Sequence, residues 1–319
     1  MRTNPFDAIY KQCNSTDYLL KLKNPLVFPR CLDIEVTNRC NLQCLMCPTG
    51  NGMSKRATGQ MSGDIYLKII NEAEKYNAAI RFIRCGEPTL HKTLIDFIKL
   101  AKTKNILCHL NTNGAILTEN YIIKILNSGL DSIKFSLQGI NLFGYNEMRL
   151  GGNYNAIINS IKTLYALRGN EKKPYIHIST TVTCEKQNEI KQFKKEMKSF
   201  CDLVTVGKTV LDYINIEETT LDAAKKTILA NLMRKESVNK IHPHCPEVFD
   251  KLSIDWDGSV TACCWDYNRY MLIGYIGTHS LKEIWECKKL NAYRNILYNM
   301  NHDSLKLCKN CYDYIELKH

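Results

Sequence analysis

Short β-rich runs alternate with amphipathic helical segments along most of this 319-residue chain. Consecutive strands joined by helices lie parallel, because only a long crossover can return the chain to the same end of a sheet, and such crossovers are right-handed. The repeat therefore predicts an α/β fold, either a partial barrel or an open doubly wound sheet. In both folds, chemistry gathers at the carboxyl ends of the strands. The predicted strands are 32–37, 79–84, 106–111, 132–137, 175–182 and 203–208.

The helices of this repeat carry start and stop signals. Ser62 and Thr118 stand where an N-cap side chain accepts a hydrogen bond from the first helical turn, and Gly129 is a typical helix stop. Isoleucines recur at helical spacing after Ser62, which indicates an amphipathic helix. The predicted helices are 64–76, 92–102, 118–129, 154–167 and 189–200, with a short one at 17–23.

Three cysteines follow the first predicted strand: Cys40, Cys44 and Cys47, spaced C-x3-C-x2-C. Three neighbouring thiolates cannot all form disulfides with one another, but they can ligate one soft metal centre. A structural zinc site normally takes four protein ligands, whereas a catalytic centre keeps a position open. We interpret this loop as a [4Fe-4S] site with one free iron. A zinc knuckle without its fourth ligand and a set of buried thiols are the alternatives.

The cysteine triplet resembles the signature of the radical S-adenosylmethionine (SAM) superfamily. The resemblance implies a (β/α)6 partial TIM-like barrel and a free iron that chelates the amino and carboxylate groups of SAM. It also implies cleavage of SAM to a 5'-deoxyadenosyl radical, which abstracts a hydrogen atom from the substrate. Met46 stands where the family usually has an aromatic residue, and its thioether can still pack against a flat ring.

A second element of the resemblance follows the second predicted strand. Gly86-Glu87-Pro88 is similar to the family's Gly-Gly-Glu-Pro element, which binds the amino group of SAM, although Cys85 replaces the first glycine. Glycine lets a ligand approach the backbone closely, and a carboxylate accepts hydrogen bonds from an ammonium group. An ordinary turn before a helix is the alternative interpretation.

Three further polar residues lie at or after the ends of the third and fourth predicted strands. The resemblance implies that Asn113 contacts SAM and that Ser136 lies near its ribose, although Gln138 departs from the family's usual aspartate. Arg149, on the following loop, can neutralise the SAM carboxylate or a substrate anion. The alternatives are a polar turn for Asn113 and an exposed surface arginine for Arg149.

Cys184 follows the fifth predicted strand, which places it at the mouth of the barrel. A thiol there can donate a hydrogen atom to a carbon radical. A passive, semi-buried cysteine is the alternative interpretation.

The chain changes character after residue 244. Two alternating runs at 252–255 and 259–263 flank Asp257-Gly258, a hairpin signal, and helices are predicted at 280–286 and 290–298. Four thiolates can enclose a second metal centre, either a [4Fe-4S] cluster or zinc. Cys264 could replace its neighbour in this set, which consists of Cys245, Cys263, Cys308 and Cys311.

This C-terminal pattern resembles the SPASM and twitch extensions of radical SAM enzymes. No further cysteine follows Cys311, which favours the twitch form with one auxiliary cluster. The predicted division is an N-terminal lead-in at 1–30, the barrel at 31–210, a linker at 211–244 with a helix at 220–236, and the auxiliary domain at 245–319.

Composition limits where such a chain works. The sequence has fifteen cysteines, an odd number, and neither a signal segment nor an apolar run of the roughly 20 residues that span a bilayer. Clustered cysteines without an export signal favour metal ligation in a reducing cytoplasm. The net charge is +11, but the lysines are dispersed over helices, which favours a solvated surface over a nucleic-acid site.

The predicted reaction starts from the auxiliary cluster. A cluster fully ligated by protein cannot bind substrate but can accept an electron. This fits a two-electron oxidation, and the resemblance to twitch enzymes implies oxidation of an alcohol of a small sugar or aminocyclitol to a ketone, with a base taking the hydroxyl proton. Epimerisation with Cys184 as hydrogen donor and modification of a peptide or carrier-bound substrate are the alternatives. A further class is a non-enzymatic metal-binding protein. The resemblance implies a reducing partner such as flavodoxin or ferredoxin.

Overall fold

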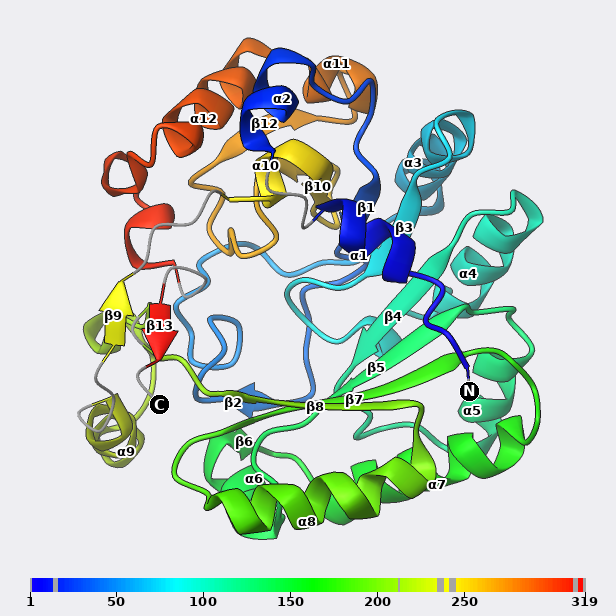
Figure 1. The fold of residues 1–319 in the computed structure, drawn as a ribbon, viewed down its shortest axis with the longest axis vertical. Helices are drawn as coiled ribbons and strands as arrows, with labels where there is room; N and C mark the ends of the chain where they lie inside the picture. The colour runs from blue at the N-terminus through cyan, green and yellow to red at the C-terminus, as the bar shows by residue number, and fades with distance from the viewer. Residues whose placement is uncertain are drawn as a thin grey trace.

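The computed structural model describes residues 2–13, 17–211, 213–233, 238–240, 245–311 and 315–317. Its centre is a curved sheet in which six parallel strands follow one another in chain order (Figure 1). This arrangement is a partial barrel and confirms the predicted fold class. The six strands are β1 (Cys31–Ile34), β3 (Ala79–Phe82), β4 (Cys108–Thr112), β5 (Ser132–Ser136), β7 (Tyr175–Val182) and β8 (Leu203–Lys208).

The predicted hairpin at 252–263 extends this same sheet. β10 (Lys251–Ile254) pairs in parallel with the outer edge of β1, so that Asp33 lies opposite Ser253. β11 (Ser259–Thr261) and β12 (Leu272–Tyr275) then add antiparallel strands. The C-terminal unit therefore continues the barrel sheet in the order β12-β11-β10-β1-β3-β4-β5-β7-β8.

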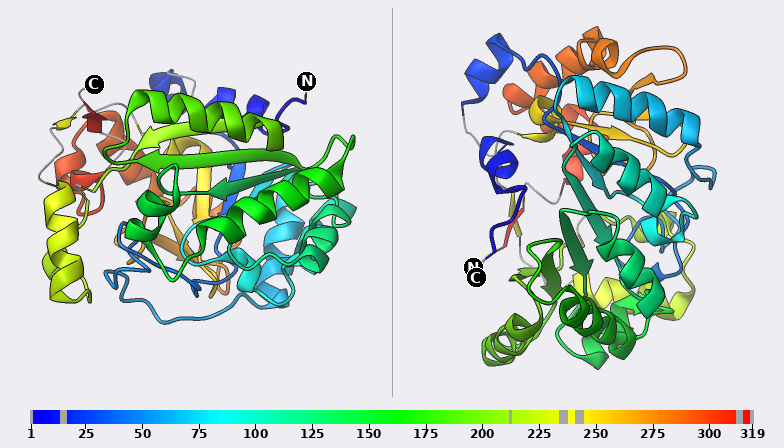
Figure 2. Two further views of the ribbon diagram at one scale, coloured as in Figure 1. Left: turned by 90° about the horizontal axis from the view of Figure 1, so that it is seen from below. Right: turned by 90° about the vertical axis from the view of Figure 1, so that its right-hand side faces the viewer.

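Five helices cover the outside of the curved sheet (Figure 2). Ser62 and Thr118 are confirmed as N-caps, since each hydroxyl accepts a backbone N–H from the first turn. The helix after Thr118 ends at Leu126, before Gly129, because Asn127 already forms its C-cap. The covering helices are α3 (Gly63–Lys75), α4 (Leu94–Thr103), α5 (Glu119–Leu126), α7 (Tyr154–Arg168) and α8 (Gln187–Met197).

The two faces of the barrel sheet differ in chemistry. Side chains alternate across a strand, and the positions that face the helices are apolar and fully buried, as at Ile34 and Phe135. The interior positions are polar and charged. The hydrophobic core thus lies between sheet and helices, and the barrel interior is lined by Asp33, Arg81, His109, Lys134 and His177.

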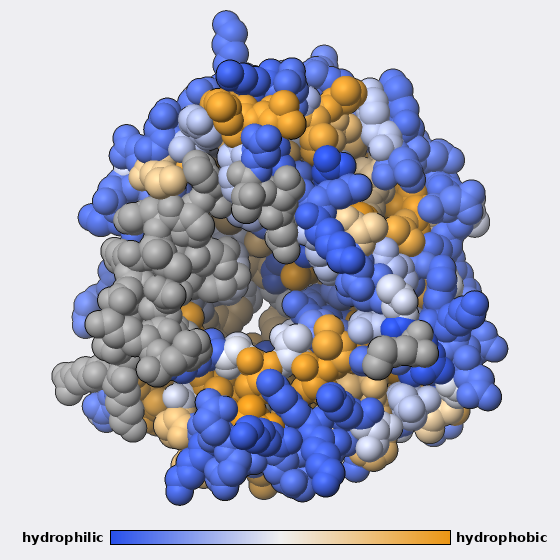
Figure 3. All heavy atoms as spheres, in the orientation of Figure 1, coloured by the Kyte–Doolittle hydropathy of each residue, from blue (hydrophilic) through white to orange (hydrophobic). Residues whose placement is uncertain are grey.

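The N-terminal lead-in packs against the amino ends of three barrel strands. Phe6, just before α1 (Asp7–Cys13), is fully buried and packs with Cys31 and Ala79, which begin their strands. The ring of Phe6 also meets the imidazole of His109 at a centroid distance of 5.5 Å. The lead-in therefore covers the amino ends of β1, β3 and β4. Figure 3 shows the molecule hollowed at its centre.

The remaining elements lie around this frame. α2 (Tyr18–Lys23) confirms the short N-terminal helix and lies beside α12 (Lys288–Tyr298) (Figure 1). The predicted linker helix is α9 (Ala223–Met233), and residues 234–236 of that prediction lie outside the described residues, as do 312–314 and 318–319 of the C-terminal unit. The other elements are β2 (Gln43–Cys44), α6 (Leu142–Met148), β6 (Arg149–Leu150), β9 (Val238–Lys240), α10 (Glu247–Asp250), α11 (Leu281–Trp285) and β13 (Ile315–Leu317).

Candidate iron–sulfur and substrate site

The three-cysteine loop begins directly after β1, where the barrel interior opens. Cys44 lies on β2 and pairs with Arg149 on β6, which fixes the middle of the loop against the segment after β5. The backbone N–H of Cys47 donates to the carbonyl of Cys44 at 3.1 Å, so these two residues form a tight turn. All three cysteines are free thiols. One short loop therefore carries three free thiols at the strand ends, and their role as cluster ligands stays a prediction.

The environment of these thiols disfavours bare thiolates. Burial raises the pKa of Cys40 to about 12 and that of Cys44 to about 11, and the neighbouring cysteine sulfurs act in the same direction. A thiolate in such a site needs a compensating positive charge, and a bound metal centre provides it. The donor set therefore fits an iron–sulfur cluster held by three protein ligands.

Arg149 faces this loop with unused hydrogen-bonding capacity. Its side chain hydrogen-bonds Cys44, which acts to lower the pKa of that thiol. The Nε of Arg149 is buried and has no hydrogen-bond partner among the described residues. A buried donor without an acceptor is costly, and an anionic group bound beside the cysteine loop would satisfy it. The half-buried placement disfavours the alternative of an exposed surface arginine.

The loop after β3 packs tightly on the cysteine loop. Gly86 has a φ of +80°, and a Cβ there would lie 2.3 Å from the carbonyl oxygen of Thr37. The backbone N–H of Glu87 donates to the carbonyl of Arg39 at 2.8 Å. Only glycine allows this approach. The structure thus brings the predicted Gly-Glu-Pro element against the cysteine loop, with Pro88 buried at the start of a short 3-10 helix (Pro88–Leu90).

The Glu87 carboxylate is already hydrogen-bonded within the protein. Its oxygens accept from the hydroxyls of Thr89 and Thr112, each at 2.7 Å, and from the backbone N–H groups of Thr89 and Asn113. Glu87 is only 2% exposed. This carboxylate therefore joins the loops after β3 and β4, and its contact with SAM stays a prediction.

Asn113 links the β4 loop to the cysteine loop. Its Nδ2 donates to Asn41 Oδ1 at 2.9 Å and lies 3.8 Å from Cys40 Sγ. Ser136 ends β5 and accepts a hydrogen bond from Asn111 Nδ2 at 3.3 Å. The carbonyl of Met46 accepts from the Tyr213 hydroxyl. The predicted SAM-side residues therefore border the cysteine loop or end a barrel strand, and their contacts with SAM remain predictions.

Cys184 lies two residues beyond the carboxyl end of β7, and its side chain is exposed. Its backbone N–H donates to Glu185 Oε2 at 3.0 Å, and the Thr183 hydroxyl lies 3.8 Å from its sulfur. The thiol is accessible, so the structure agrees with a position at the barrel mouth rather than with a semi-buried one. Its role as a hydrogen donor remains a prediction.

The second cysteine group surrounds the end of the extended sheet. Cys263 follows β11, and its pKa is raised by a hydrogen bond with Cys264, by burial and by the proximity of Cys245. Cys308 Sγ lies 3.8 Å from the sulfur of Met271. The backbone carbonyl of Met271 accepts a hydrogen bond from the N–H of Ala262, the residue before Cys263. The N–H of Cys311 donates to the carbonyl of Cys308 at 3.1 Å. These placements fit a cluster bounded by the hairpin end and the C-x2-C turn.

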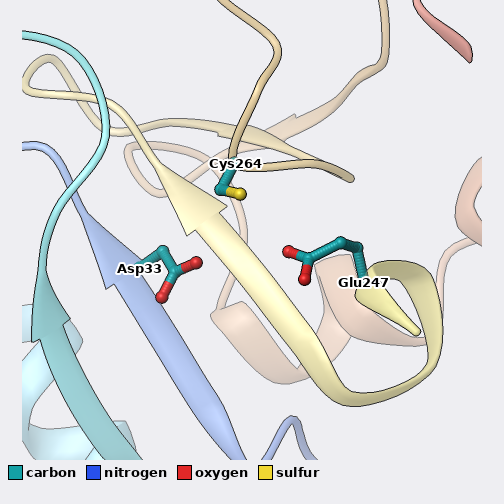
Figure 4. A group of neighbouring side chains, drawn as sticks. All are labelled: Asp33, Glu247 and Cys264. Atoms are coloured by element: carbon teal, nitrogen blue, oxygen red, sulfur yellow. The ribbon is translucent and has the colours of Figure 1, made fainter. Parts of the chain in front are cut away.

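The two adjacent hairpin cysteines have different surroundings. Cys264 lies within 4.8 Å of a carboxylate oxygen from both Asp33 and Glu247 (Figure 4). Asp33 is held by both arms of Arg81, at 2.5 and 2.6 Å, and Glu247 pairs with Lys251. The carboxylates are thus balanced by cations, and the group forms part of the charged barrel lining. Since Cys264 belongs to this lining, Cys263 is the better candidate ligand.

Lys134 is the unpaired cation of this lining. It occupies the interior position of β5 that precedes Ser136, and neither a hydrogen bond nor an ion pair joins its Nζ to any described residue. Burial lowers the pKa of Lys134 to about 8, with a further decrease from Arg81 and opposing effects from Cys264 and Asp33. An amine of this pKa can accept a proton near neutral pH.

Fold and donor set together define an α/β barrel built around an iron–sulfur loop. A family model described as "Radical SAM superfamily" matches residues 34–196, half of the chain, and a second, "Iron-sulfur cluster-binding domain" (SPASM), matches residues 245–312. The chain therefore belongs to the radical SAM superfamily. Membership in this superfamily implies that the protein binds SAM and a [4Fe-4S] cluster. The SPASM match implies auxiliary iron–sulfur binding by the C-terminal unit.

Similarity to individual proteins extends over most of the chain. A protein of Pyrococcus furiosus described as "Tungsten-containing aldehyde ferredoxin oxidoreductase cofactor-modifying protein" is 25% identical over 314 residues, covering 88% of this chain and 86% of the relative. The structure of BtrN with AdoMet and 2-DOIA is similar at a TM-score of 0.59 and 19% identity, covering 91% of this chain and 99% of BtrN. The structure of Streptococcus suis SuiB bound to precursor peptide SuiA is similar at a TM-score of 0.63 and 19% identity. This similarity covers 97% of this chain and 76% of SuiB. At such identities the two structures support the fold alone.

Three residues of this region escaped the sequence analysis: Arg56, Arg84 and Lys134. Lys134 had a signal, because a lysine between Ile133 and Phe135 in a buried strand indicates a polar inner face. The two arginines had none, since they hydrogen-bond Tyr267 and Cys263, about 200 positions away in the sequence.

Proposed function

We propose that this protein oxidises an alcohol of a small polyhydroxylated molecule, such as a sugar or aminocyclitol, to a ketone. The observation that carries the proposal is the polar and charged lining of the barrel interior. Its paired and unpaired side chains can hydrogen-bond several hydroxyl groups at once. An apolar interior would instead favour a hydrophobic substrate. Among the described residues, no helix is long and apolar enough to cross a bilayer. The clustered cysteines are the basis on which we propose a cytoplasmic location.

The oxidation removes one hydrogen atom, one proton and one electron from the alcohol. When bound, SAM and its cluster supply the 5'-deoxyadenosyl radical that takes the hydrogen atom, and the auxiliary cluster accepts the electron. Lys134 is the candidate acceptor for the hydroxyl proton, because its amine lies on the inner face and its pKa is lowered. Arg149 is the candidate partner of the SAM carboxylate. A reducing partner such as flavodoxin or ferredoxin would deliver the initiating electron.

Epimerisation is the second candidate, and the exposed thiol of Cys184 at the carboxyl end of β7 favours it. In that reaction the thiol returns a hydrogen atom to the other face of the same carbon. Peptide modification is the third candidate, which the likeness to SuiB bound to its precursor peptide makes worth testing.

One experiment separates the first two candidates. The anaerobically reconstituted enzyme is incubated in D2O with SAM, a reductant and a panel of sugars and aminocyclitols. Oxidation predicts a product lighter by two hydrogens and turnover that survives Cys184→Ala. An epimerase would give an isomer carrying one solvent deuterium, and Cys184→Ala would abolish it. No SAM cleavage would contradict both.

A further inference from the structure

Arg84 connects the loop after β3 with the auxiliary cysteine loop. Its φ of +114° lies in a region that residues other than glycine rarely adopt, so the surrounding contacts hold the backbone there. Its side chain is fully buried. The unusual backbone and the buried charge occur at one residue, two positions before Gly86 of the loop that packs on the SAM-side cysteines.

The guanidinium of Arg84 reaches into the C-terminal unit. Nη1 donates to the Thr261 hydroxyl at 2.8 Å and to the carbonyl of Cys263 at 3.2 Å. Nη2 donates to the carbonyl of Asp266 at 3.1 Å and pairs with Asp255 at 2.7 Å. These contacts hold both ends of the short segment that begins with the candidate cluster ligand Cys263.

A second arginine supports the same segment. Arg56, which follows the SAM-side cysteine loop, donates from Nε to the carbonyl of Tyr267 at 2.8 Å. Its other two nitrogens bind the two oxygens of Glu35 at 2.8 and 2.6 Å. Glu35 follows β1 directly, and its carboxylate lies 3.9 Å from Arg84 Nε. Two buried arginines of the barrel thus contact three carbonyls of the auxiliary loop, those of Cys263, Asp266 and Tyr267.

We propose that Arg84 is a positioning residue that couples the two cluster loops, fixing the Cys263 segment relative to the SAM-side loop and raising the reduction potential of the auxiliary cluster. A buried positive charge and hydrogen bonds beside a cluster ligand stabilise the electron that the cluster gains. The planar fork of arginine meets four acceptors at once, which the single ammonium of lysine cannot do. The inference rests on the cluster assignment and not on the proposed reaction.

The test uses the anaerobically reconstituted full chain and needs no substrate. Iron content and an EPR-monitored redox titration are measured for the wild type, Arg84→Gln, Arg84→Lys and Arg269→Gln. Arg269 is the matched control, because it pairs with Asp255 at 2.7 Å and with Asp257 at 2.6 Å but contacts none of the three carbonyls through a described hydrogen bond.

We expect Arg84→Gln to keep the iron of the SAM-side cluster and its spectral change on SAM addition. Its auxiliary cluster should either titrate at a more negative potential or be lost, with about four fewer irons per chain. Arg84→Lys should shift the same potential in the same direction, and Arg269→Gln should match the wild type.

Unchanged auxiliary potential and iron content in Arg84→Gln would overturn the proposal. An equal shift in Arg269→Gln would do the same, because it would show a general charge effect. If Arg84→Gln does not fold, the Arg84→Lys variant provides the test. A wild-type EPR spectrum and a wild-type auxiliary potential in Arg84→Lys would show that the arginine guanidinium is not required. Absence of enzymatic turnover would leave all of these measurements valid.

Discussion

The backbone N–H of Asn113 donates to Glu87 Oε2 at 2.7 Å and joins two strand-end loops that both border the SAM-side cysteines. Four donors in all converge on this buried carboxylate. One buried side chain therefore links the two loops.

Replacing Glu87 by glutamine should therefore destabilise the protein. The amide nitrogen is a donor and would face a protein donor, leaving at least one buried group unsatisfied, at a cost of about 1–3 kcal/mol. Urea unfolding of the metal-free chain measures this loss. Glu196→Gln is the control, because this exposed side chain contacts only Gln192 through a described hydrogen bond, and its free energy of unfolding should be unchanged. Equal stability of the Glu87 variant and the wild type would contradict the linking role.

Lys134→Met should stabilise the metal-free protein at pH 7 while reducing turnover. Folding lowers the pKa of Lys134 to about 8, so below that pH the folded state carries a half-buried ammonium at a cost of about 1–3 kcal/mol that methionine removes. Between pH 8 and the usual lysine pKa, the unfolded state binds more protons than the folded state. Wild-type stability therefore rises relative to the variant in this window.

The check on Lys134 is the difference in unfolding free energy between variant and wild type at pH 7 and pH 10. The advantage of the variant should shrink at the higher pH. An advantage that is absent at pH 7, or that does not change with pH, would show that Lys134 is not an unpaired half-buried cation. Lys191→Met, at an exposed position of α8, serves as the control.

The adjacent cysteines of the hairpin should behave differently. Cys263→Ser should lose the auxiliary cluster and about four irons per chain, whereas Cys264→Ser should retain the full iron content. The reason is that Cys264 belongs to the group with Asp33 and Glu247 in the barrel lining. Iron analysis and EPR after anaerobic reconstitution measure the outcome. Iron loss in Cys264→Ser alone would reverse the assignment.

Arg149→Gln should weaken SAM binding about tenfold, which corresponds to roughly 1.4 kcal/mol for a lost charge-assisted hydrogen bond. The basis is the buried Nε of Arg149, which has no partner among the described residues. Calorimetric titration of the reconstituted enzyme with SAM gives the affinity. Arg2→Gln, which alters a partly exposed arginine remote from the cysteine loops in sequence, should bind like the wild type. Undiminished affinity in Arg149→Gln would refute the contact.

Local sequence signals predicted the frame of this site well. The bounds of β7 and β8 agree with the predicted strands, because Val, Ile and Thr alternate there between two clear breaks. The cysteine spacing predicted a three-ligand loop without knowledge of the fold. The interior charge of β5 was readable as well, from a single lysine between Ile133 and Phe135.

Contacts between distant segments were not predictable from one sequence. The pairing of β10 with β1 joins residues more than 200 positions apart, and nothing in either strand specifies the other. The positive φ of Arg84 depends on acceptors in the auxiliary loop, which no local pattern shows. The hydrogen bonds that Glu87 accepts from the loop after β4 also have no local signal in the sequence.

The parallel pairing of β10 with β1 has a consequence for how the protein can be divided. Removing the C-terminal unit would uncover the backbone donors and acceptors along one side of β1, and an open strand of this kind invites pairing with other molecules. The barrel and the C-terminal unit are therefore not interchangeable modules. A chimera that contains the auxiliary region of another enzyme would need a strand that pairs with β1 in the correct register. Otherwise the edge of β1 would stay unpaired and prone to aggregation.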